Sequence, residues 1–366
     1  MKRLCKDVDI TDLAFIRQAI DDCLRKKKKS RRDIAALLAE HDNDRDAIAH
    51  TLQQELRARY LILKPIWYST RIDSSSQKPR TIGIQDIKQQ MYDYIAVNAL
   101  EPVFRSIGEY QVASIPNRGN DYGIKAIAKW VKDDEVRYVG KMDIRKFYES
   151  VDRELLLKKL RRRVKNDALL WLVETLISTF NHGLSIGSYL SQFLANWYLS
   201  ELYHDVSERM YRVRRKRNGE TVRVNLVKHV LFQMDDLFVF GTNAKDVNKV
   251  VHMMIDKLNE MHLTVKPNWR VYKLSDSVFV DVLGVRIYRD RVTIRQHVFL
   301  KVRRTFKKAR RAMYPALAKR IISYWGILKH TSSYVLRKRL KAPRYVKEAR
   351  RLISRESTIR REAETA

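Results

Sequence analysis

The sequence has only two cysteines, Cys5 and Cys23, in 366 residues. Two thiols are too few for a disulfide framework or for a cysteine zinc site, so both are expected to be ordinary thiols. Long apolar runs are also lacking, since no stretch approaches the ~20 residues that would span a bilayer. The first residues lack the apolar core of a signal peptide. These absences predict a soluble, cytoplasmic protein.

Acidic residues are scarce relative to basic ones. The 42 Asp and Glu residues oppose 74 Lys and Arg residues, which leaves a formal net charge of +32. Such an excess must be neutralised, and nucleic acid is the commonest polyanion, with a membrane surface as the second candidate. A hydrophobic content of 45% indicates a folded protein, and the length suffices for two or three subdomains.

The most informative stretch is Leu231–Phe240, where Asp235 and Asp236 interrupt an apolar run of strand-forming residues. An unpartnered buried carboxylate is so costly that it normally protonates. Two acids at the turn of an apolar hairpin therefore predict a counter-ion, and Mg²⁺ prefers carboxylate oxygens and shares its sphere with substrate phosphates. Two such ions about 4 Å apart serve phosphoryl displacement in polymerases. A plainer interpretation is a hairpin turn with solvated acids and no metal.

A second acid, Asp143, lies between the apolar residues Met142 and Ile144 on a predicted strand, and Tyr148 follows five residues later. This pattern places a carboxylate at the end of a strand with a flat ring beside it, where the ring could bar a ribose 2′-hydroxyl. The alternative is that Asp143 caps a strand-to-helix turn.

Two further segments suit a nucleotide. Lys78 and Arg80 alternate on an extended segment, so both cations point to one side, a geometry that suits a triphosphate. Solvent-facing cations on a strand have the same pattern. Gly183 and Gly187 make a loop whose backbone can approach a ligand closely, but a tight turn before a buried helix needs the same small residues.

Hydrophobic periodicity predicts the remaining elements. Helices are expected within 10–62, with Thr11 as a cap, at 87–104, at 124–131, over 153–178 as one amphipathic helix, over 246–261 and from 298 onward. Strands are expected at 63–68, 77–84, 139–144, 231–240, 263–266 and 278–287, with a bend at Gly284.

Basic residues dominate two segments. Between residues 301 and 361 the only acids are Glu348 and Glu356, and Tyr324, Trp325 and Tyr334 are interleaved with the cations. This composition indicates a footprint for a nucleic-acid backbone. The run at 25–32 is either a second backbone contact or a solvated charged face.

The order of these segments resembles the reverse transcriptase family over about residues 60–340. The markers are Asp143-x-x-x-Phe147-Tyr148, the segment Ile186–Gln192, and Gln233-Met234-Asp235-Asp236. The resemblance implies an α+β right-hand polymerase with fingers, a palm with an antiparallel sheet, a helical basic thumb, and a helical N-terminal extension. It implies a basic extension at 1–62, fingers at 63–137, a palm with finger insertions at 138–295, and a thumb with a basic tail at 296–366.

The same resemblance implies roles for individual residues. The catalytic carboxylates and ligands of two Mg²⁺ ions, with Mn²⁺ as the alternative metal, would be Asp143, Asp235 and Asp236. The dNTP would be bound by Lys78, Arg80, Tyr148 as a sugar gate, Ile186, Gly187, Gln192 and Lys266. Primer and template would be bound by Gln233, Met234, Leu283, Gly284, Arg303, Arg304, Lys307 and Lys308.

Within the family, the segments Ile186–Gln192 and Ser323–His330 resemble the reverse transcriptases of bacterial diversity-generating retroelements and their relatives in phage defence. Two positions depart from the usual pattern: Gln233 stands where an aromatic residue is usual, and Ile186 where Gln is usual. Both positions adjoin the primer end or the nascent base pair in relatives, which implies unusual fidelity, template choice or priming. No protease, ribonuclease H or endonuclease motif is found, which argues against a self-sufficient retrotransposon or a retrovirus-type enzyme.

The leading hypothesis is therefore an RNA-directed DNA polymerase that makes cDNA from a dedicated bacterial noncoding RNA in antiphage defence. A mutagenic reverse transcriptase of a diversity-generating retroelement is the alternative, and a catalytically inactive RNA-binding scaffold is the alternative of another class. The expected partners are the RNA template, the DNA product and dNTPs. An accessory protein, a second reverse transcriptase and a homo-oligomer stay open, and no membrane is expected.

Overall fold

The computed structural model describes residues 3–25, 27–28, 31–72 and 79–365, with side chains to residue 359. The chain divides into two compact units. The first comprises Met1–Arg118, Gly140–Phe240 and Ala244–Val271, and the second comprises Gly119–Val139, Gly241–Asn243 and Tyr272–Ala366. Helices and strands occur in both, so the fold class is α+β as predicted. None of the described helices combines the length and apolarity that a bilayer crossing requires.

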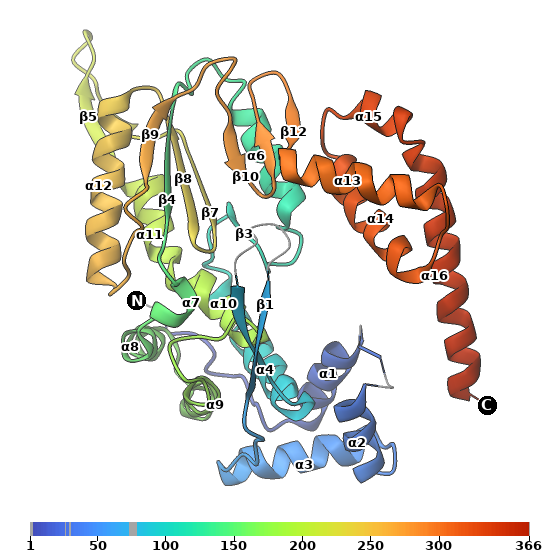
Figure 1. Ribbon diagram of the computed structural model, residues 1–366. Coiled ribbons are helices and arrows are strands. Elements are labelled where there is room, and N and C mark those ends of the chain that lie inside the picture. Colours follow the sequence, from blue (N-terminus) through green and yellow to red (C-terminus); the bar gives the residue numbers. More distant parts are fainter. Residues whose placement is uncertain (1–2, 26, 29–30, 73–78, 366) are drawn as a thin grey trace. The chain divides into compact units, whose positions relative to one another are not determined.

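Three helices precede the first strand, in agreement with the sequence-based prediction. They are α1 (Leu13–Leu24), α2 (Arg32–Glu40) and α3 (Arg45–Ala58). The predicted cap is wrong: Asp12, not Thr11, caps α1, because its carboxylate accepts a hydrogen bond from the Phe15 N–H at 2.7 Å. Helix α1 contacts α3 and α4 (Figure 1), and its residues Ile16 and Ile20 are fully buried.

A hairpin and two helices follow. Strands β1 (Trp67–Ile72) and β2 (Pro79–Ile84) are antiparallel, and Trp67 pairs with Ile84. The strand predicted from Leu63 begins later than expected, at Trp67, where pairing with β2 starts. The predicted helical stretch after β2 is occupied by α4 (Ile87–Ala99) and α5 (Glu101–Phe104).

The central sheet has five strands in the order β3-β7-β8-β4-β9. Their bounds are β3 (Gln111–Val112), β4 (Tyr138–Asp143), β7 (His229–Gln233), β8 (Asp236–Gly241) and β9 (Arg270–Lys273). Strands β7 and β8 form the predicted antiparallel hairpin, but β3 pairs with β7 in parallel, so the sheet is mixed rather than purely antiparallel. Neither β9 nor the pairing of β3 was predicted.

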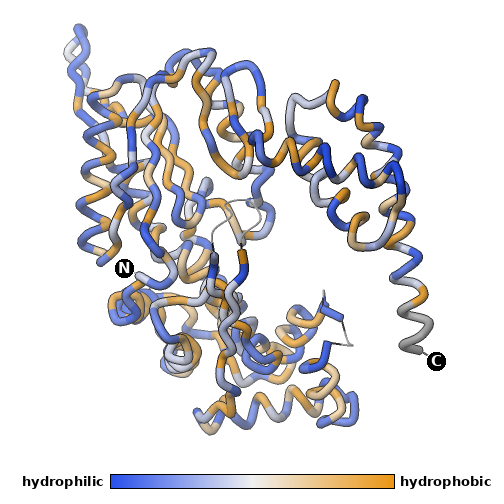
Figure 2. Tube along the Cα trace, in the orientation of Figure 1, coloured by the Kyte–Doolittle hydropathy of each residue, from blue (hydrophilic) through white to orange (hydrophobic). Residues whose placement is uncertain are grey.

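Helix α12 (Ala244–Glu260) packs on this sheet. A β-carbon at Gly140 in β4 would lie 2.8 Å from a methyl group of Val251 in α12, so strand and helix are in close contact. Figure 2 shows hydrophobic and hydrophilic residues alternating along α12. The buried residues Val247, Val250 and Val251 therefore face the sheet side of an amphipathic helix, as the periodicity predicts.

Between β4 and β7 the chain is mostly helical. The elements are α7 (Phe147–Ser150), α8 (Arg153–Arg163), α9 (Asp167–Ser178), α10 (Tyr189–Tyr198), α11 (Ser200–His204) and a π-helical turn, η1 (Asp205–Arg209). The single helix predicted over 153–178 is wrong. It is interrupted because Asn166 is extended and its side chain caps α9 by accepting from the Leu169 N–H at 2.9 Å.

A further antiparallel hairpin separates η1 from β7. It consists of β5 (Tyr211–Arg215) and β6 (Thr221–Asn225), and it projects at the upper left of Figure 1. The sequence analysis made no prediction for these residues.

The second unit contains α6 (Asn120–Trp130), a small sheet and the C-terminal helices. The sheet has the order β10-β11-β12, with bounds β10 (Val280–Val282), β11 (Val285–Ile287) and β12 (Val292–Ile294). The helices are α13 (Gln296–Ala309), α14 (Pro315–Leu328), α15 (Tyr334–Arg339) and α16 (Ala342–Thr365). Val302, Phe306 and Ile321 are fully buried in one cluster that joins α13, α14 and α16.

The two remaining strand predictions have different outcomes. The strand predicted at 263–266 is reduced to a single bridge between Ile144 and Val265. The predicted bend at Gly284 is confirmed as a hairpin turn: Leu283 and Gly284 connect β10 to β11 with φ angles of +55° and +82°, the left-handed pair typical of two-residue hairpins.

Candidate active site

The β7–β8 hairpin holds two neighbouring acids at its turn. Gln233 pairs with Asp236 across the hairpin, so Met234 and Asp235 form the connection. Met234 adopts a left-handed conformation with φ +53°, which costs a residue with a side chain about 1–2 kcal/mol. The residues of β8 that follow Asp236 are buried, so the two carboxylates lie at the edge of an apolar core.

Asp143 ends β4 beside this turn. The Ile144 N–H donates a hydrogen bond to the Asp235 carbonyl oxygen at 2.8 Å, which ties the end of β4 to the turn. The Lys266 N–H donates to the Asp143 carbonyl oxygen at 2.8 Å, and the Lys266 ammonium forms an ion pair with the Asp143 carboxylate. The structure therefore brings Asp143, Asp235, Asp236 and Lys266 to one place from three separate segments.

The electrostatics of the turn favour an added cation. Burial raises the pKa of Asp236 to about 6; Lys141 and Lys266 oppose the rise, while Asp235 and Asp143 add to it. Burial also raises the pKa of Asp235, and the charge of Asp143 adds to this effect. Negative charge is thus concentrated where the nearby lysines do not fully offset its burial.

Tyr148 in α7 lies against the same turn. Its hydroxyl donates to the Met234 sulfur at 3.5 Å, and the Asn196 amide contacts that sulfur at the same distance. Burial raises the pKa of Tyr148, and the charge of Asp235 raises it further. The ring is therefore held beside the carboxylates with its hydroxyl protonated.

Asp93 of α4 holds the loop that contains Gly187 through hydrogen bonds. Ser188 caps α10 by accepting from the Ser191 N–H at 3.1 Å, and its hydroxyl donates to the Asp93 carboxylate at 2.7 Å. The Leu190 N–H also donates to Asp93, at 3.3 Å. Asp93 is fully buried, and burial raises its pKa to about 6. The sequence analysis missed this residue, although an acid within an otherwise buried helix face is a signal that could have found it.

The same loop is in direct backbone contact with strand β2. A β-carbon at Gly187 would overlap the Gly83 carbonyl oxygen, and one at Gly83 would lie 2.5 Å from the Ser185 hydroxyl. Strand β2 also carries Arg80, whose charge partly opposes the rise in the pKa values of Asp235 and Tyr148. The predicted nucleotide-binding segments that carry Arg80, Gly187 and Tyr148 therefore adjoin. Lys78 lies outside the described residues.

Comparison with known families identifies the family of the chain. A family model described as Reverse transcriptase (RNA-dependent DNA polymerase) matches residues 71–287, which is more than half of the chain and includes all three acids. The chain belongs to the reverse transcriptase family. The sequence matches no curated protein.

Membership confirms the predicted activity at the family level. This reverse transcriptase is an RNA-directed DNA polymerase, a nucleotidyltransferase that uses an RNA template and dNTPs to make DNA. The family also implies the palm and fingers of a polymerase fold, which agrees with the mixed helix and sheet of the first unit.

Reverse transcriptases generally use divalent metal ions. Within the described part of the chain, no three His, Cys, Asp or Glu side chains are gathered closely enough to hold one ion alone. Mg²⁺, however, is commonly bound through one or two carboxylates, with water and substrate phosphates in the remaining positions. Asp143 and the partly exposed Asp235 fit that arrangement, because desolvation and the charge of Asp143 together raise the pKa of Asp235.

The other predicted site residues are placed as follows. Ile186 and Gln192 flank the Asp93-bound segment of the loop and α10. Leu283 and Gly284 form the β10–β11 turn in the second unit. The four predicted primer and template cations all lie on α13, and three of them line a hollow of about 290 Å³: Arg303, Arg304 and Lys307.

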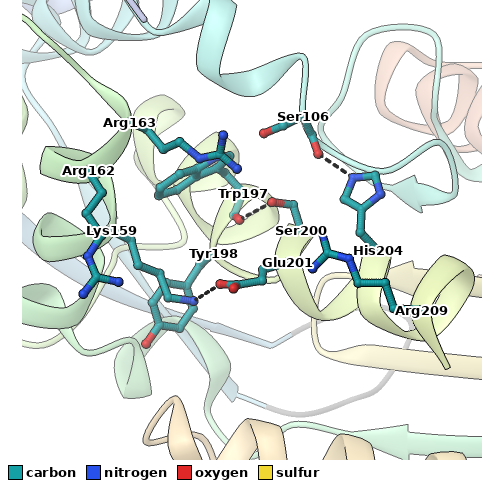
Figure 3. A pocket seen from close by; sticks show the side chains of 10 residues that line it. All are labelled: Ser106, Lys159, Arg162, Arg163, Trp197, Tyr198, Ser200, Glu201, His204 and Arg209. Atoms are coloured by element: carbon teal, nitrogen blue, oxygen red, sulfur yellow. Dashed lines mark hydrogen bonds and ion pairs between the residues drawn. The ribbon is translucent and has the colours of Figure 1, made fainter. Parts of the chain in front are cut away.

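A separate basic pocket of about 310 Å³ lies in the first unit, where residues of α8, α10, α11 and η1 meet (Figure 3). Lys159, Arg162, Arg163 and Arg209 line it, and Lys159 forms an ion pair with Glu201 at 3.1 Å. Asp143, Asp235 and Asp236 are not among its lining residues, so this pocket is separate from the candidate active site.

Proposed function

We propose that this reverse transcriptase is a bacterial enzyme that copies a dedicated noncoding RNA into cDNA and acts in antiphage defence. The observation that carries the catalytic part is the convergence of Asp143, Asp235, Asp236 and Lys266 at the β7–β8 turn. The role in defence is supported by the segments Ile186–Gln192 and Ser323–His330, which resemble those of diversity-generating retroelement enzymes and their defence relatives.

In the proposed reaction, the primer 3′-hydroxyl attacks the α-phosphate of the dNTP, and pyrophosphate leaves. Two Mg²⁺ ions, or Mn²⁺ in their place, held by Asp143 and Asp235 with support from Asp236, would lower the pKa of that hydroxyl and stabilise the leaving group. Lys266 and Arg80 neutralise triphosphate charge beside the carboxylates.

Neighbouring residues select and position the nucleotide in this proposal. The Tyr148 ring excludes a ribose 2′-hydroxyl, because it is packed beside the turn with its hydroxyl on Met234. Gly187 lets the loop backbone, with Ile186 and Gln192, approach the nucleotide closely. Gln233 and Met234 meet the primer end, and the Leu283-Gly284 turn grips the primer.

The subdomain division follows the family pattern. We assign the helical extension to 1–62, the fingers to 63–137, the palm to 138–295 and the thumb to 296–366. The basic helix α13, with Arg303, Arg304, Lys307 and Lys308, then supplies backbone contacts to the template–primer duplex, which a basic face can make by shape without a base code.

The catalytic proposal is tested by replacing both turn acids. Purified protein with Mg²⁺, dNTPs and its co-purified RNA is expected to make cDNA, and Asp235→Ala with Asp236→Ala is expected to abolish synthesis while the thermal unfolding profile persists. The matched control is Asp256→Ala, which removes an exposed acid from α12. Undiminished synthesis in the double variant would overturn the assignment of the catalytic acids.

The biological role is tested separately. Expression of the active enzyme with its RNA is expected to reduce phage plaque numbers, and the double variant is expected to give no protection. Sequencing the bound RNA and the cDNA identifies the template, and a product with dispersed substitutions would instead favour the mutagenic retroelement enzyme. Gln233 is the observation behind that alternative, so Gln233→Tyr is expected to change the error rate if the residue contacts the nascent pair.

A further inference from the structure

The hairpin β5–β6 is a basic ribbon that the polymerase site leaves unexplained. From Tyr211 to Asn225 the chain carries six cations and one acid, Glu220. All of β5 is exposed, and β6 is exposed at every second residue. Val213 is 63% exposed although it pairs with Arg223 in the middle of the ribbon. A two-stranded ribbon with this much charge repels itself, so its conformation is favoured by a polyanion.

The cations of the ribbon differ in their surroundings. Arg212 forms an ion pair with Asp246 at 3.0 Å, and Lys216 forms one with Glu220 at 2.9 Å. By contrast, no acid in the described part of the chain lies within ion-pair distance of Arg214, Arg215 or Arg217, all of which are exposed. Three guanidinium groups on one projection are therefore available to an external anion.

The base of the ribbon is fixed while its tip projects. The Asn225 amide donates to the Ser207 carbonyl oxygen at 3.1 Å, and the Leu226 N–H donates to the Met210 carbonyl oxygen at 2.9 Å. The first bond ties the end of β6 to η1, a π-helical turn of a kind often found at functional sites, and the second joins the residues that flank the ribbon. An isolated two-stranded hairpin is only marginally stable, so this anchoring keeps the arginines presented.

Basic residues continue from the ribbon base into the pocket of Figure 3. Arg209, the last residue of η1, lines that pocket together with Arg162 and Arg163 from α8. No acid among the described residues lies within ion-pair distance of Arg162 or Arg163. The positive surface at the ribbon base is thus wider than the ribbon alone.

The ribbon lies at the end of the β7–β8 hairpin that is remote from the catalytic turn. The chain enters β7 at His229 directly after the ribbon, and the turn acids follow Gln233 at the other end of β7. Five strand residues separate these ends by about 14 Å. The part of a nucleic acid that contacts the ribbon is therefore not the base pair being formed at the turn.

The composition of the ribbon favours a duplex over a single strand. Binding of single strands without sequence preference relies on several aromatic platforms for unpaired bases. Between residues 211 and 225 the only aromatic residue is Tyr211, and its ring is covered by the Arg223 guanidinium at 4.7 Å. Backbone phosphates, which are closely spaced along a duplex, suit a row of arginines without free aromatic faces.

We propose that the β5–β6 ribbon binds the phosphate backbone of a double-stranded segment of the template RNA, outside the segment that is being copied. The inference rests on the proposed use of a dedicated, folded RNA. It assigns to the first unit an RNA-anchoring surface that is distinct from the basic helix α13 of the second unit.

The test replaces the three unpaired arginines. The variant Arg214→Gln, Arg215→Gln, Arg217→Gln is compared with wild type for binding to an RNA stem-loop of about 16 base pairs, the span of known double-stranded RNA-binding domains. The dissociation constant is expected to rise roughly tenfold or more at moderate salt, and the slope of log K against log salt is expected to fall by about 2 to 3, because each phosphate contact contributes about one unit.

Two control variants define what the result means. The substitutions Lys158→Gln, Lys165→Gln and Lys249→Gln remove the same charge from exposed positions elsewhere in the first unit and are expected to leave both quantities near wild type. Arg→Lys at the three ribbon positions keeps the charge and is expected to retain most of the binding. Wild-type affinity in the Gln variant, or an equal loss in the lysine control, overturns the proposal, as does a larger loss for a single strand than for the stem.

Polymerase activity separates this inference from the catalytic one. On a short RNA template with an annealed DNA primer, the ribbon variant is expected to keep the wild-type turnover number and dNTP KM, since the ribbon is remote from the turn. On the co-purified RNA, cDNA yield at limiting RNA is expected to fall. A wild-type protein that fails on both templates refutes the polymerase assignment, while a ribbon variant that fails equally on both refutes the ribbon assignment.

Discussion

Gly187 and Gly83 are in backbone contact, and neither position has room for a side chain. A β-carbon at Gly187 would overlap the Gly83 carbonyl oxygen, and one at Gly83 would lie 2.5 Å from the Ser185 hydroxyl. The two glycines therefore allow the strand that carries Arg80 and the loop before α10 to approach closely.

Gly187→Ala is expected to separate β2 from the loop and to impair nucleotide binding. Because the overlapping atom belongs to the backbone, relief requires movement of β2 itself. We expect the dNTP KM to rise about tenfold or more, since a misplacement of about 1 Å is already costly in a positioned site. Steady-state kinetics on a short primer–template measures the effect. The control is Gly119→Ala, because a β-carbon there meets nothing within 4 Å; equal kinetics for the two variants would contradict the prediction.

Lys266→Gln is expected to reduce kcat/KM for dNTP by roughly 10²–10³, the usual loss when one preorganised charge-stabilising group is removed. Lys266 forms an ion pair with Asp143 and its N–H binds the Asp143 carbonyl oxygen, so the charge is held at the site by the backbone. The Mg²⁺ concentration for half-maximal rate is expected not to rise, since loss of a neighbouring ammonium leaves the carboxylates more attractive to metal. Lys249→Gln is the surface control, and a purely metal-dependent defect would argue against this role.

Tyr148→Ala is expected to increase ribonucleotide incorporation relative to dNTP by roughly 10- to 100-fold, the range in which a pocket distinguishes small groups by shape. The ring lies beside the β7–β8 turn. Among the described residues, the Met234 sulfur is the only hydrogen-bond partner of the Tyr148 hydroxyl. Tyr148→Phe keeps the ring and is expected to retain discrimination. Product analysis with each rNTP in turn checks both variants, and loss of discrimination in the Phe variant would implicate the hydroxyl rather than the ring.

Asp93 gives a prediction about stability and pH. Its pKa is raised to about 6 in the folded protein, whereas an unfolded Asp has a pKa near 3.9. Between these pH values the folded state binds more protons than the unfolded state. The contribution of Asp93 to the free energy of unfolding is therefore most favourable below about pH 4 and is lost as the pH rises to about 6. The full change is about 3 kcal/mol.

Asp93→Asn removes this titration. The difference in unfolding free energy between variant and wild type is expected to shift in favour of the variant by up to about 3 kcal/mol from roughly pH 4 to pH 7. Urea unfolding at several pH values measures it. Asp93→Ala removes the acceptor of Ser188 and the Leu190 N–H and is expected to be destabilised throughout. A difference that does not vary with pH would show that Asp93 titrates as in the unfolded chain.

The sequence could predict the candidate site where its signals are local. Asp235 and Asp236 stand out because acids rarely interrupt a buried hairpin, and Asp143 because it ends an apolar strand. The Ile144–Asp235 and Lys266–Asp143 bonds join segments far apart in the chain, so their contact followed only from family resemblance and from the structure. The role of Asp93 was missed because Ser188, which it holds, lies 95 residues away.

Some misses were avoidable. The Asn218-Gly219 dipeptide, flanked by Val213 and by Val222, is a strong local signal for a hairpin and predicts β5–β6. Asn166 is a good capping residue and marks the break between α8 and α9. The parallel pairing of β3 has no such signal, because a two-residue strand is defined by its neighbour alone.

The bonds that hold the β7–β8 turn beside Asp143 use main-chain atoms. Ile144 donates to a carbonyl oxygen of Asp235, and Lys266 donates to one of Asp143, so exchange of the carboxylate side chains leaves these bonds intact. A variant with both Asp235 and Asp236 replaced is therefore expected to bind its own nucleic acid as the wild type does. Such an inactive chain, expressed in its host, is a reagent for isolating the uncopied template at full length.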